Sequence, residues 1–271
     1  MSPLAPRRER VRAATIAEIK QAARDQVAHG GVAAVSLRGV ARAMGMTPSA
    51  LYRYFDSHDV LIGELVADAF GSLADTLEAA FDAGVDEADQ ARRWLLLARA
   101  YRRWAHANEA EYALLFGPRS LELDKTGRCT EEMHRATGVL FRCMIDQIGR
   151  GAVDPSHLEG QLRPALRSGL ADWGVEEQAA ISPAGLAGCL IVWTQLHGFL
   201  SLELFGHLPP TLGALGVFDD LFDQQMLDVI VRIGYRHPID IATTAAPSPD
   251  GWLAAAPAPV RALAAGGPAA P

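Results

Sequence analysis

Apolar positions recur every three or four residues along most of this chain, and no segment shows the strict alternation of a half-buried strand. This period predicts an all-helical fold. Glycines, prolines and capping serines or threonines mark the ends of the periodic stretches. The predicted helices are residues 8–29, 37–44, a short helix from 48, then 58–83, 88–108, 109–116, 131–148, 158–173, 182–205 and 218–235.

Several of these helices carry more specific expectations. Helix 58–83 is long enough to leave a first domain and enter a second, and helix 158–173 is expected to bend near Pro164. From Ala242 onward the sequence is rich in alanine, proline and glycine, which predicts a disordered tail. The inner stripe of the first helix is expected to include Val11, Ile16, Ile19, Ala23 and Val27.

Charge divides the chain unevenly. The net charge is −7, but residues 1–60 hold nine basic and five acidic side chains, whereas the remainder holds 16 basic and 27 acidic ones. Because attraction to phosphate acts locally and is screened within about 8–10 Å in physiological salt, a basic first domain can bind nucleic acid beside an acidic body.

The remaining composition limits the class of protein. Cys129, Cys143 and Cys189 show neither a disulfide framework nor a metal-ligand spacing. Buried, unreactive thiols are therefore expected, and neither a metal nor a cofactor is expected. No apolar run is interpreted as a membrane span, and the basic first ten residues lack the apolar stretch of a signal peptide. The sequence therefore predicts a cytoplasmic protein without a membrane partner.

Residues 36–55, SLRGVARAMGMTPSALYRYF, meet the steric demands of a helix-turn-helix. Ala41 is small where two helices would cross, Gly45 lies in a turn where a positive φ is expected, and Leu51 points inward from the second helix. Small and polar residues on the outer side of that helix allow it to enter a major groove. A helical hairpin without a role in DNA binding is the alternative.

At these residues the chain resembles the TetR family of transcriptional regulators. The resemblance covers about the first 65 residues, and it includes the 36–55 segment and the long helix that starts at DSHDVL. Two later segments, NEAEYALLFGP and WTQLHGFLSLELFGHLP, resemble a C-terminal domain type named for its Trp…His-Gly motif, here Trp193, His197 and Gly198. The implied division is a helix-turn-helix DNA-binding domain at 1–56 with a basic arm at about 1–8, an effector-binding and dimerisation domain at 57–240, and a tail at 241–271.

The resemblance also implies which residues contact DNA. Thr47, Ser49 and Tyr54 are expected at phosphates, assisted by the N-terminus of the second helix. Base edges or the nearby backbone are the expected contacts of Arg38, Ala50, Tyr52 and Arg53. The implied DNA-binding residues are Arg38, Thr47, Pro48, Ser49, Ala50, Tyr52, Arg53, Tyr54 and His58. Arginines of the arm and the first helix are expected to add further contacts.

Alternatives stay open for several of these residues. Arg53 can instead pair with Asp56, and Tyr52 and Tyr54 can instead pack within the domain. His58 stands where members of the family commonly carry a lysine that touches phosphate. That contact is therefore lost or pH-dependent, or His58 is exposed without a role.

Aromatic side chains are concentrated in the second part of the chain. They are expected to line an apolar cavity for an unknown small molecule, with a few polar groups to orient it, and the alternative is that they only form the core. The expected pocket residues are Trp94, Tyr101, Trp104, Tyr112, Phe116, Phe141, Trp193 and His197.

The last two long helices are the expected dimer interface. Two recognition helices about 34–36 Å apart read successive major grooves of a palindromic operator, which favours a homodimer, although a monomer can bury the same apolar side chains. The side chains expected to contribute are Leu186, Leu190, Trp193, Leu202, Leu221, Met226, Val229 and Ile233.

The predicted function is a DNA-binding transcriptional regulator, by family default a repressor, which a small-molecule effector releases from its operator. An enzyme is not predicted, because the eight histidines are scattered and no H-E-x-x-H, phosphate loop or G-x-S-x-G element is present. The alternative is a helical protein-interaction adaptor or ligand-binding protein. An adaptor would keep its function after Tyr52→Ala and Arg53→Ala.

Overall fold

The computed structural model describes residues 7–116, 127–176, 181–240 and 244. Within these residues the regular structure is helical, apart from an isolated antiparallel bridge between Val153 and Tyr235. The all-helical prediction is therefore confirmed. The chain forms two compact units, residues 1–72 with 108–135 and residues 73–107 with 136–271. The predicted functional division after residue 56 stays a prediction.

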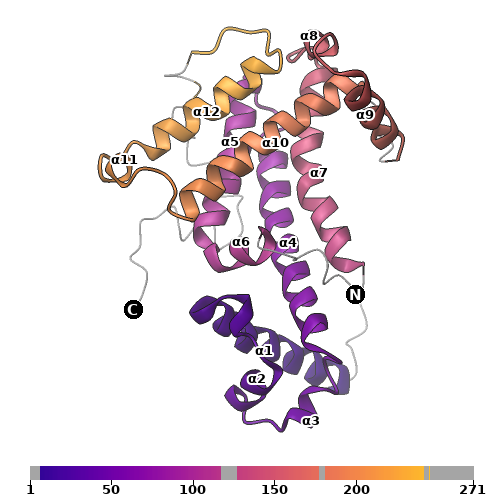
Figure 1. Cartoon of the computed structure of the whole chain (residues 1–271), viewed down its shortest axis with the longest axis vertical. Helices are drawn as coiled ribbons and strands as arrows, with labels where there is room; N and C mark the ends of the chain where they lie inside the picture. Colours follow the sequence, from indigo (N-terminus) through magenta and orange to yellow (C-terminus); the bar gives the residue numbers. More distant parts are fainter. Residues whose placement is uncertain (1–6, 117–126, 177–180, 241–243, 245–271) are drawn as a thin grey trace. The chain divides into compact units, whose positions relative to one another are not determined.

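The first unit packs the N-terminal helices around a small apolar core (Figure 1). Its elements are α1 (Arg7–Gly30), η1 (Val32–Ala34), α2 (Leu37–Ala43), α3 (Pro48–Leu51), the first part of α4 (His58–Ala83), α6 (Glu109–Phe116) and the start of α7 (Arg128–Gly149). Helix α1 contacts η1, α2 and α6, and α2 contacts α3. Ile19, Val40, Leu51 and Leu61 are fully buried in this unit. We call α1–α3 with the start of α4 the head.

The second unit is built around α10 (Figure 1). Its elements are the rest of α4 and α7 together with α5 (Gln90–Ala107), α8 (Ser156–Glu159), α9 (Pro164–Glu176), α10 (Pro183–Leu204), α11 (Pro210–Ala214) and α12 (Phe218–Arg232). Helix α10 contacts α5, α8, α9 and α12. The indole N–H of the fully buried Trp94 donates a hydrogen bond to the Met226 carbonyl at 2.8 Å, which joins α5 to α12.

Four helices begin at the capping residues that the sequence predicts. The hydroxyls of Ser36, Thr47, Ser57 and Ser182 each accept a hydrogen bond from the backbone N–H three residues later. Each hydroxyl satisfies one of the N–H groups that a helix start leaves without an intrahelical partner. The predicted starts of these four helices are confirmed.

Some local predictions are wrong. Val11 is 57% exposed rather than part of the inner stripe, because it lies on the first turns of α1, before the buried stripe that starts at Ile19. Pro164 begins α9 instead of bending a longer helix, as expected of a residue without an N–H group. Helix α1 begins at Arg7, one residue before the predicted start, so Arg7 is helical. The short elements η1 and α11 were not predicted.

Helix α10 bears on the prediction that no apolar run is a membrane span. It is the one helix among the described residues that is long and apolar enough to cross a membrane, and half of its most apolar window is buried within the protein. The core helix of a soluble protein has the same composition, and the contacts of α10 with four neighbouring helices fit that role.

The predicted disorder of the tail concerns residues outside the described part of the chain, except for Thr244. Thr244 is buried, and its hydroxyl donates a hydrogen bond to Asp89 at 2.9 Å. Arg92 donates to the Thr244 carbonyl at 3.1 Å. The predicted disorder of the tail stays a prediction.

Candidate nucleic-acid interface

The turn between α2 and α3 has the geometry that the sequence requires. Gly45 has a φ of +64°, in the left-handed region that favours glycine. The Met46 N–H donates a hydrogen bond to the Ala41 carbonyl at 2.8 Å, which closes the turn. Ala41 is fully buried beside it. The predicted positive φ and the small residue next to the turn are both confirmed.

Helix α3 is only one turn long, and its inner side anchors it to the head. Leu51 is fully buried and Phe55 nearly so. The Tyr54 and Phe55 N–H groups donate to the Leu51 carbonyl at 2.9 and 3.2 Å, so turns continue the chain beyond the helix. This anchoring leaves the other side of residues 47–54 exposed to solvent.

The exposed start of α3 carries two hydroxyls. Thr47, Pro48 and Ser49 are exposed. The Thr47 hydroxyl accepts from the Ala50 N–H at 3.3 Å and lies 3.1 Å from the Ser49 hydroxyl. Hydroxyls and backbone N–H groups at a helix start are common ligands of DNA phosphates.

The next residues present an aromatic ring and a guanidinium to solvent. Tyr52 is 50% exposed, Arg53 is exposed, and Ala50 is half-buried. Arg53 forms no ion pair with Asp56 within the described part of the chain. The alternative pairing of Arg53 with Asp56 is therefore not seen, and half of the Tyr52 side chain is open to solvent.

The other three predicted DNA-binding residues, Tyr54, Arg38 and His58, differ in how exposed they are. The half-buried Tyr54 ring has the Arg12 guanidinium 5.1 Å from its centroid, so it packs partly against α1. Arg38 is exposed on α2. His58 is half-buried, and its ring Nδ1 lies 3.4 Å from a carboxylate oxygen of Asp59, so an acidic side chain lies beside the imidazole.

The expected effector residues fall in both compact units. Tyr112 and Phe116 belong to the first unit, where their rings lie 4.8 Å apart between centroids. The six others belong to the second unit, in which Trp94, Tyr101 and Trp104 are buried.

Within the second unit the Trp193 ring lies nearly parallel to two other rings. Its centroid lies 6.3 Å from that of Tyr101, at an interplanar angle of 7°, and 5.2 Å from that of His197, at 12°. Burial lowers the pKa of His197, which favours a neutral imidazole. Phe141, Trp193 and His197 are half-buried, so they are the members that a ligand in this unit could contact.

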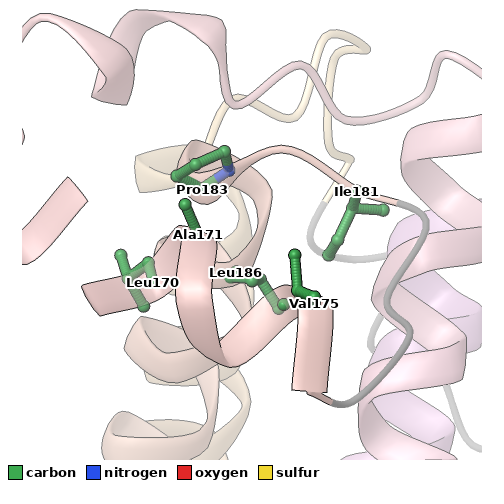
Figure 2. A pocket seen from close by; sticks show the side chains of 7 residues that line it. Leu170, Ala171, Val175, Ile181, Pro183 and Leu186 are labelled. Atoms are coloured by element: carbon green, nitrogen blue, oxygen red, sulfur yellow. The ribbon is translucent and has the colours of Figure 1, made fainter. Parts of the chain in front are cut away.

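The described residues form an apolar cavity elsewhere in the second unit, between α9 and α10 (Figure 2). Its volume is about 310 Å³, at the lower end of the range for ligand pockets. Leu170, Ala171, Gly174, Val175, Ile181, Pro183 and Leu186 line it. None of the eight expected effector residues is among them. Sequence reasoning missed this cavity because its lining is aliphatic and carries no distinctive motif.

The expected dimer residues divide into two groups. Leu186, Met226, Val229 and Ile233 are buried within the single chain, so the alternative of internal burial holds for them. The other four keep some exposure, from the half-buried Leu190, Trp193 and Leu221 to the exposed Leu202.

Comparison with known proteins covers both parts of the chain. Residues 19–65 match the family model described as bacterial regulatory proteins, tetR family, and residues 94–229 match the model described as tetracyclin repressor-like, C-terminal domain. An HTH-type transcriptional regulator of Mycobacterium tuberculosis is 33% identical over 198 residues, which are 70% of this chain and 80% of that protein.

Solved structures agree with these matches. The crystal structure of SCO4313, named as a regulatory protein, shares 33% sequence identity and a TM-score of 0.62, over 84% of this chain and 100% of that chain. A structure described as a tetR family transcription regulator from Shewanella sp. PV-4 has a TM-score of 0.54 at 15% identity, over 82% of this chain and 98% of that one. At that identity the likeness shows the fold alone.

Proposed function

Because the chain belongs to the TetR family of transcriptional regulators, we propose that it is a cytoplasmic repressor that binds a palindromic DNA operator as a homodimer and leaves it when a small molecule binds. The proposal includes no catalysis and no cofactor. It also assigns the second part of the chain to the Trp-His-Gly type, on the motif formed by Trp193, His197 and Gly198.

The exposed surface of residues 47–54 is the observation that carries this proposal. Thr47 and Ser49 offer hydroxyls for phosphates, and Tyr52 and Arg53 extend from a helix whose inner side is anchored by the buried Leu51. Arg38 from α2 and Tyr54 and His58 beyond α3 complete the proposed contact surface. A short helix with small exposed residues at its start can approach base edges closely.

The proposed dimer interface lies on the exposed side of α10 and α12. Leu202 on α10 is 46% exposed and Val231 on α12 is 54% exposed. A Cβ at Gly198 would meet no heavy atom within 4 Å in the described structure, so α10 leaves room for a close approach of a second helix. Closely packed helices use such small residues to bring their axes together.

Dimerisation can be tested with charges placed on this surface. Leu202→Glu and Val231→Glu are expected to make the protein monomeric in sedimentation equilibrium, because each would bury an unpaired charge in the interface. Val175→Glu is the matched control, since Val175 is 79% exposed on α9 and lies outside the proposed interface. A dimer that persists in both test variants would reject this surface.

The effector is proposed to bind in the second unit and to change DNA affinity through α4. A coupling free energy of about 1–3 kcal/mol would lower operator affinity some 5–150-fold. The half-buried Trp193 and His197 and the aliphatic cavity between α9 and α10 are two separate places for this ligand. Compounds that raise the melting temperature of the wild type but not of Trp193→Ala locate the site at the aromatic stack. Loss of that shift in Leu186→Ala locates it in the aliphatic cavity.

The proposed function is tested by selection of DNA from a pool of random duplexes by the full chain, followed by footprinting of the selected sites. A palindrome with two half-sites is the expected outcome. Tyr52→Ala and Arg53→Ala are expected to weaken binding by about 1–3 kcal/mol wherever they touch a base edge, while the surface control Arg167→Ala is expected to leave it unchanged. A wild-type protein that enriches no sequence would favour a protein-interaction adaptor. Variants that bind the selected DNA as well as the wild type would remove Tyr52 and Arg53 from the contact surface.

A further inference from the structure

A cluster of five charged side chains joins three helices of the first compact unit. Lys20 of α1 donates hydrogen bonds to Glu64 and Asp68 of α4 at 2.8 and 3.1 Å. Arg128, the first residue of α7, donates to the same two carboxylates at 2.7 and 2.8 Å. Arg24 of α1 donates to Asp68 at 2.8 Å. Within this cluster three cations share two carboxylates.

The inner part of the cluster is largely withdrawn from water. The Lys20 side chain is 11% exposed, and those of Glu64 and Asp68 are each 22% exposed. Burial by itself would raise the pKa of Asp68, but the hydrogen bonds and charges of Arg128 and Lys20 outweigh burial and hold that pKa below its ordinary value. Both the position and the charge state of the Asp68 carboxylate therefore depend on its partners.

The three cations are not equivalent. Lys20 and Arg24 both come from α1 and by themselves match the two negative charges of α4. Arg128 is the surplus cation, and its side chain is 39% exposed. If α7 moved away, the pairs between α1 and α4 would still be balanced, so no buried charge would lose its partner. The contact of α7 can therefore open without unfolding the head.

Helix α7 is suited to carry such a contact. Its first turns lie close to α4, since a Cβ added at Gly71 would come within 3.4 Å of the Glu132 carboxylate. Beyond Arg135 the same helix continues into the second compact unit, which holds the proposed effector site. A displacement of α7 by a ligand would therefore act directly on Arg128.

We propose that Arg128 is a positioning residue for operator binding, a releasable tether that restrains the head through Glu64 and Asp68. The inference rests on the proposed function and deepens it, because it names a contact through which DNA binding is regulated. Two heads on one dimer gain affinity for a full operator only when each is held near its half-site, and a loose head lowers this effective concentration. The tether acts on the joint binding of two heads and not on the contact of one head with DNA.

The experiment compares the wild type, Arg128→Gln and the charge-matched control Arg167→Gln as full chains. The probes are a palindromic duplex that the wild type has selected and the same duplex with one half-site scrambled. Arg128→Gln is expected to weaken binding to the full palindrome about fivefold or more, while binding to the single half-site stays within about twofold of the control. Arg128→Lys should recover only part of the loss, because an ammonium lacks the rigid, planar pair of donor nitrogens that Arg128 directs at the two carboxylates.

Hydrogen exchange of α1 separates a tether from a purely structural contact. The amides of α1 are expected to keep their protection in Arg128→Gln, since Lys20 and Arg24 keep their partners. Equal loss on both duplexes, no loss on the full palindrome, or loss of protection in α1 would each overturn the tether. A wild type that selects no duplex would instead overturn the proposed function, and the tether with it.

Discussion

Replacement of Gly45 by alanine is expected to lower the free energy of unfolding by about 1–2 kcal/mol. Gly45 has a φ of +64°, where the Cβ of an L-residue comes too close to the backbone at about this energy. No heavy atom in the described structure lies within 4 Å of the place where that Cβ would stand, so no clash with a neighbour adds to the loss. Since the strain is equal in the free and DNA-bound protein, operator affinity is expected to stay within about twofold, far below the factor of 10 that 1.4 kcal/mol would produce.

The assay is urea unfolding followed by circular dichroism, with DNA titrations at a temperature where every variant is folded. Gly45→Asn should lose less stability than Gly45→Ala, because asparagine adopts the left-handed region more readily. Gly149→Ala is the matched control, since Gly149 also has open space around it but no positive φ. Wild-type stability in Gly45→Ala, or equal losses for alanine and asparagine, would refute the argument from backbone conformation.

Three further predictions concern single side chains. His58→Lys should add a phosphate contact. The slope of the logarithm of the binding constant against the logarithm of salt concentration should then become steeper by about one. An unchanged slope would place residue 58 away from DNA. Burial alone would raise the pKa of Glu203, but hydrogen bonds from His106 and Arg102 outweigh it and lower the pKa to about 2. The ionised Glu203 therefore stabilises the fold above its ordinary pKa of 4.5, and this stabilisation is lost as the pH falls toward 2. The free energy of unfolding, measured at a series of acid pH values, should fall less in Glu203→Gln than in the wild type. Burial raises the pKa of Cys143 to about 11 and that of Cys189 to about 12, so a thiol reagent should label both only after unfolding, and rapid labelling of the native protein would contradict their burial.

The accuracy of the sequence-based predictions depended on how local their physical cause was. Caps such as Ser36 and Thr47 and the turn glycine Gly45 were predicted correctly, because a hydroxyl three residues before an N–H or a missing Cβ acts within one turn of chain. Pro164 was placed in the wrong context, since a proline suits both a helix start and a kink and the choice depends on what precedes it. Val11 continued an apolar period but lies before the part of α1 that is buried.

For the proposed DNA-binding surface, the sequence by itself indicated which residues face solvent. Once Leu51 is buried and Gly45 closes the turn, Thr47 at the N-cap of α3 and Tyr52 and Arg53 just after its end are exposed. The resemblance to a known family then gave that surface a function.

Only the tertiary structure decided which distant groups meet. Lys20 falls on the inner side of α1 beside Ile19, and nothing nearby in sequence predicts that carboxylates of α4 and the guanidinium of Arg128 pair around it. The aliphatic cavity between α9 and α10 is likewise formed by residues that read as ordinary core. Burial and ion pairing between helices depend on how separate segments pack in space. The hydrophobic period of one segment does not indicate which other segments it will contact.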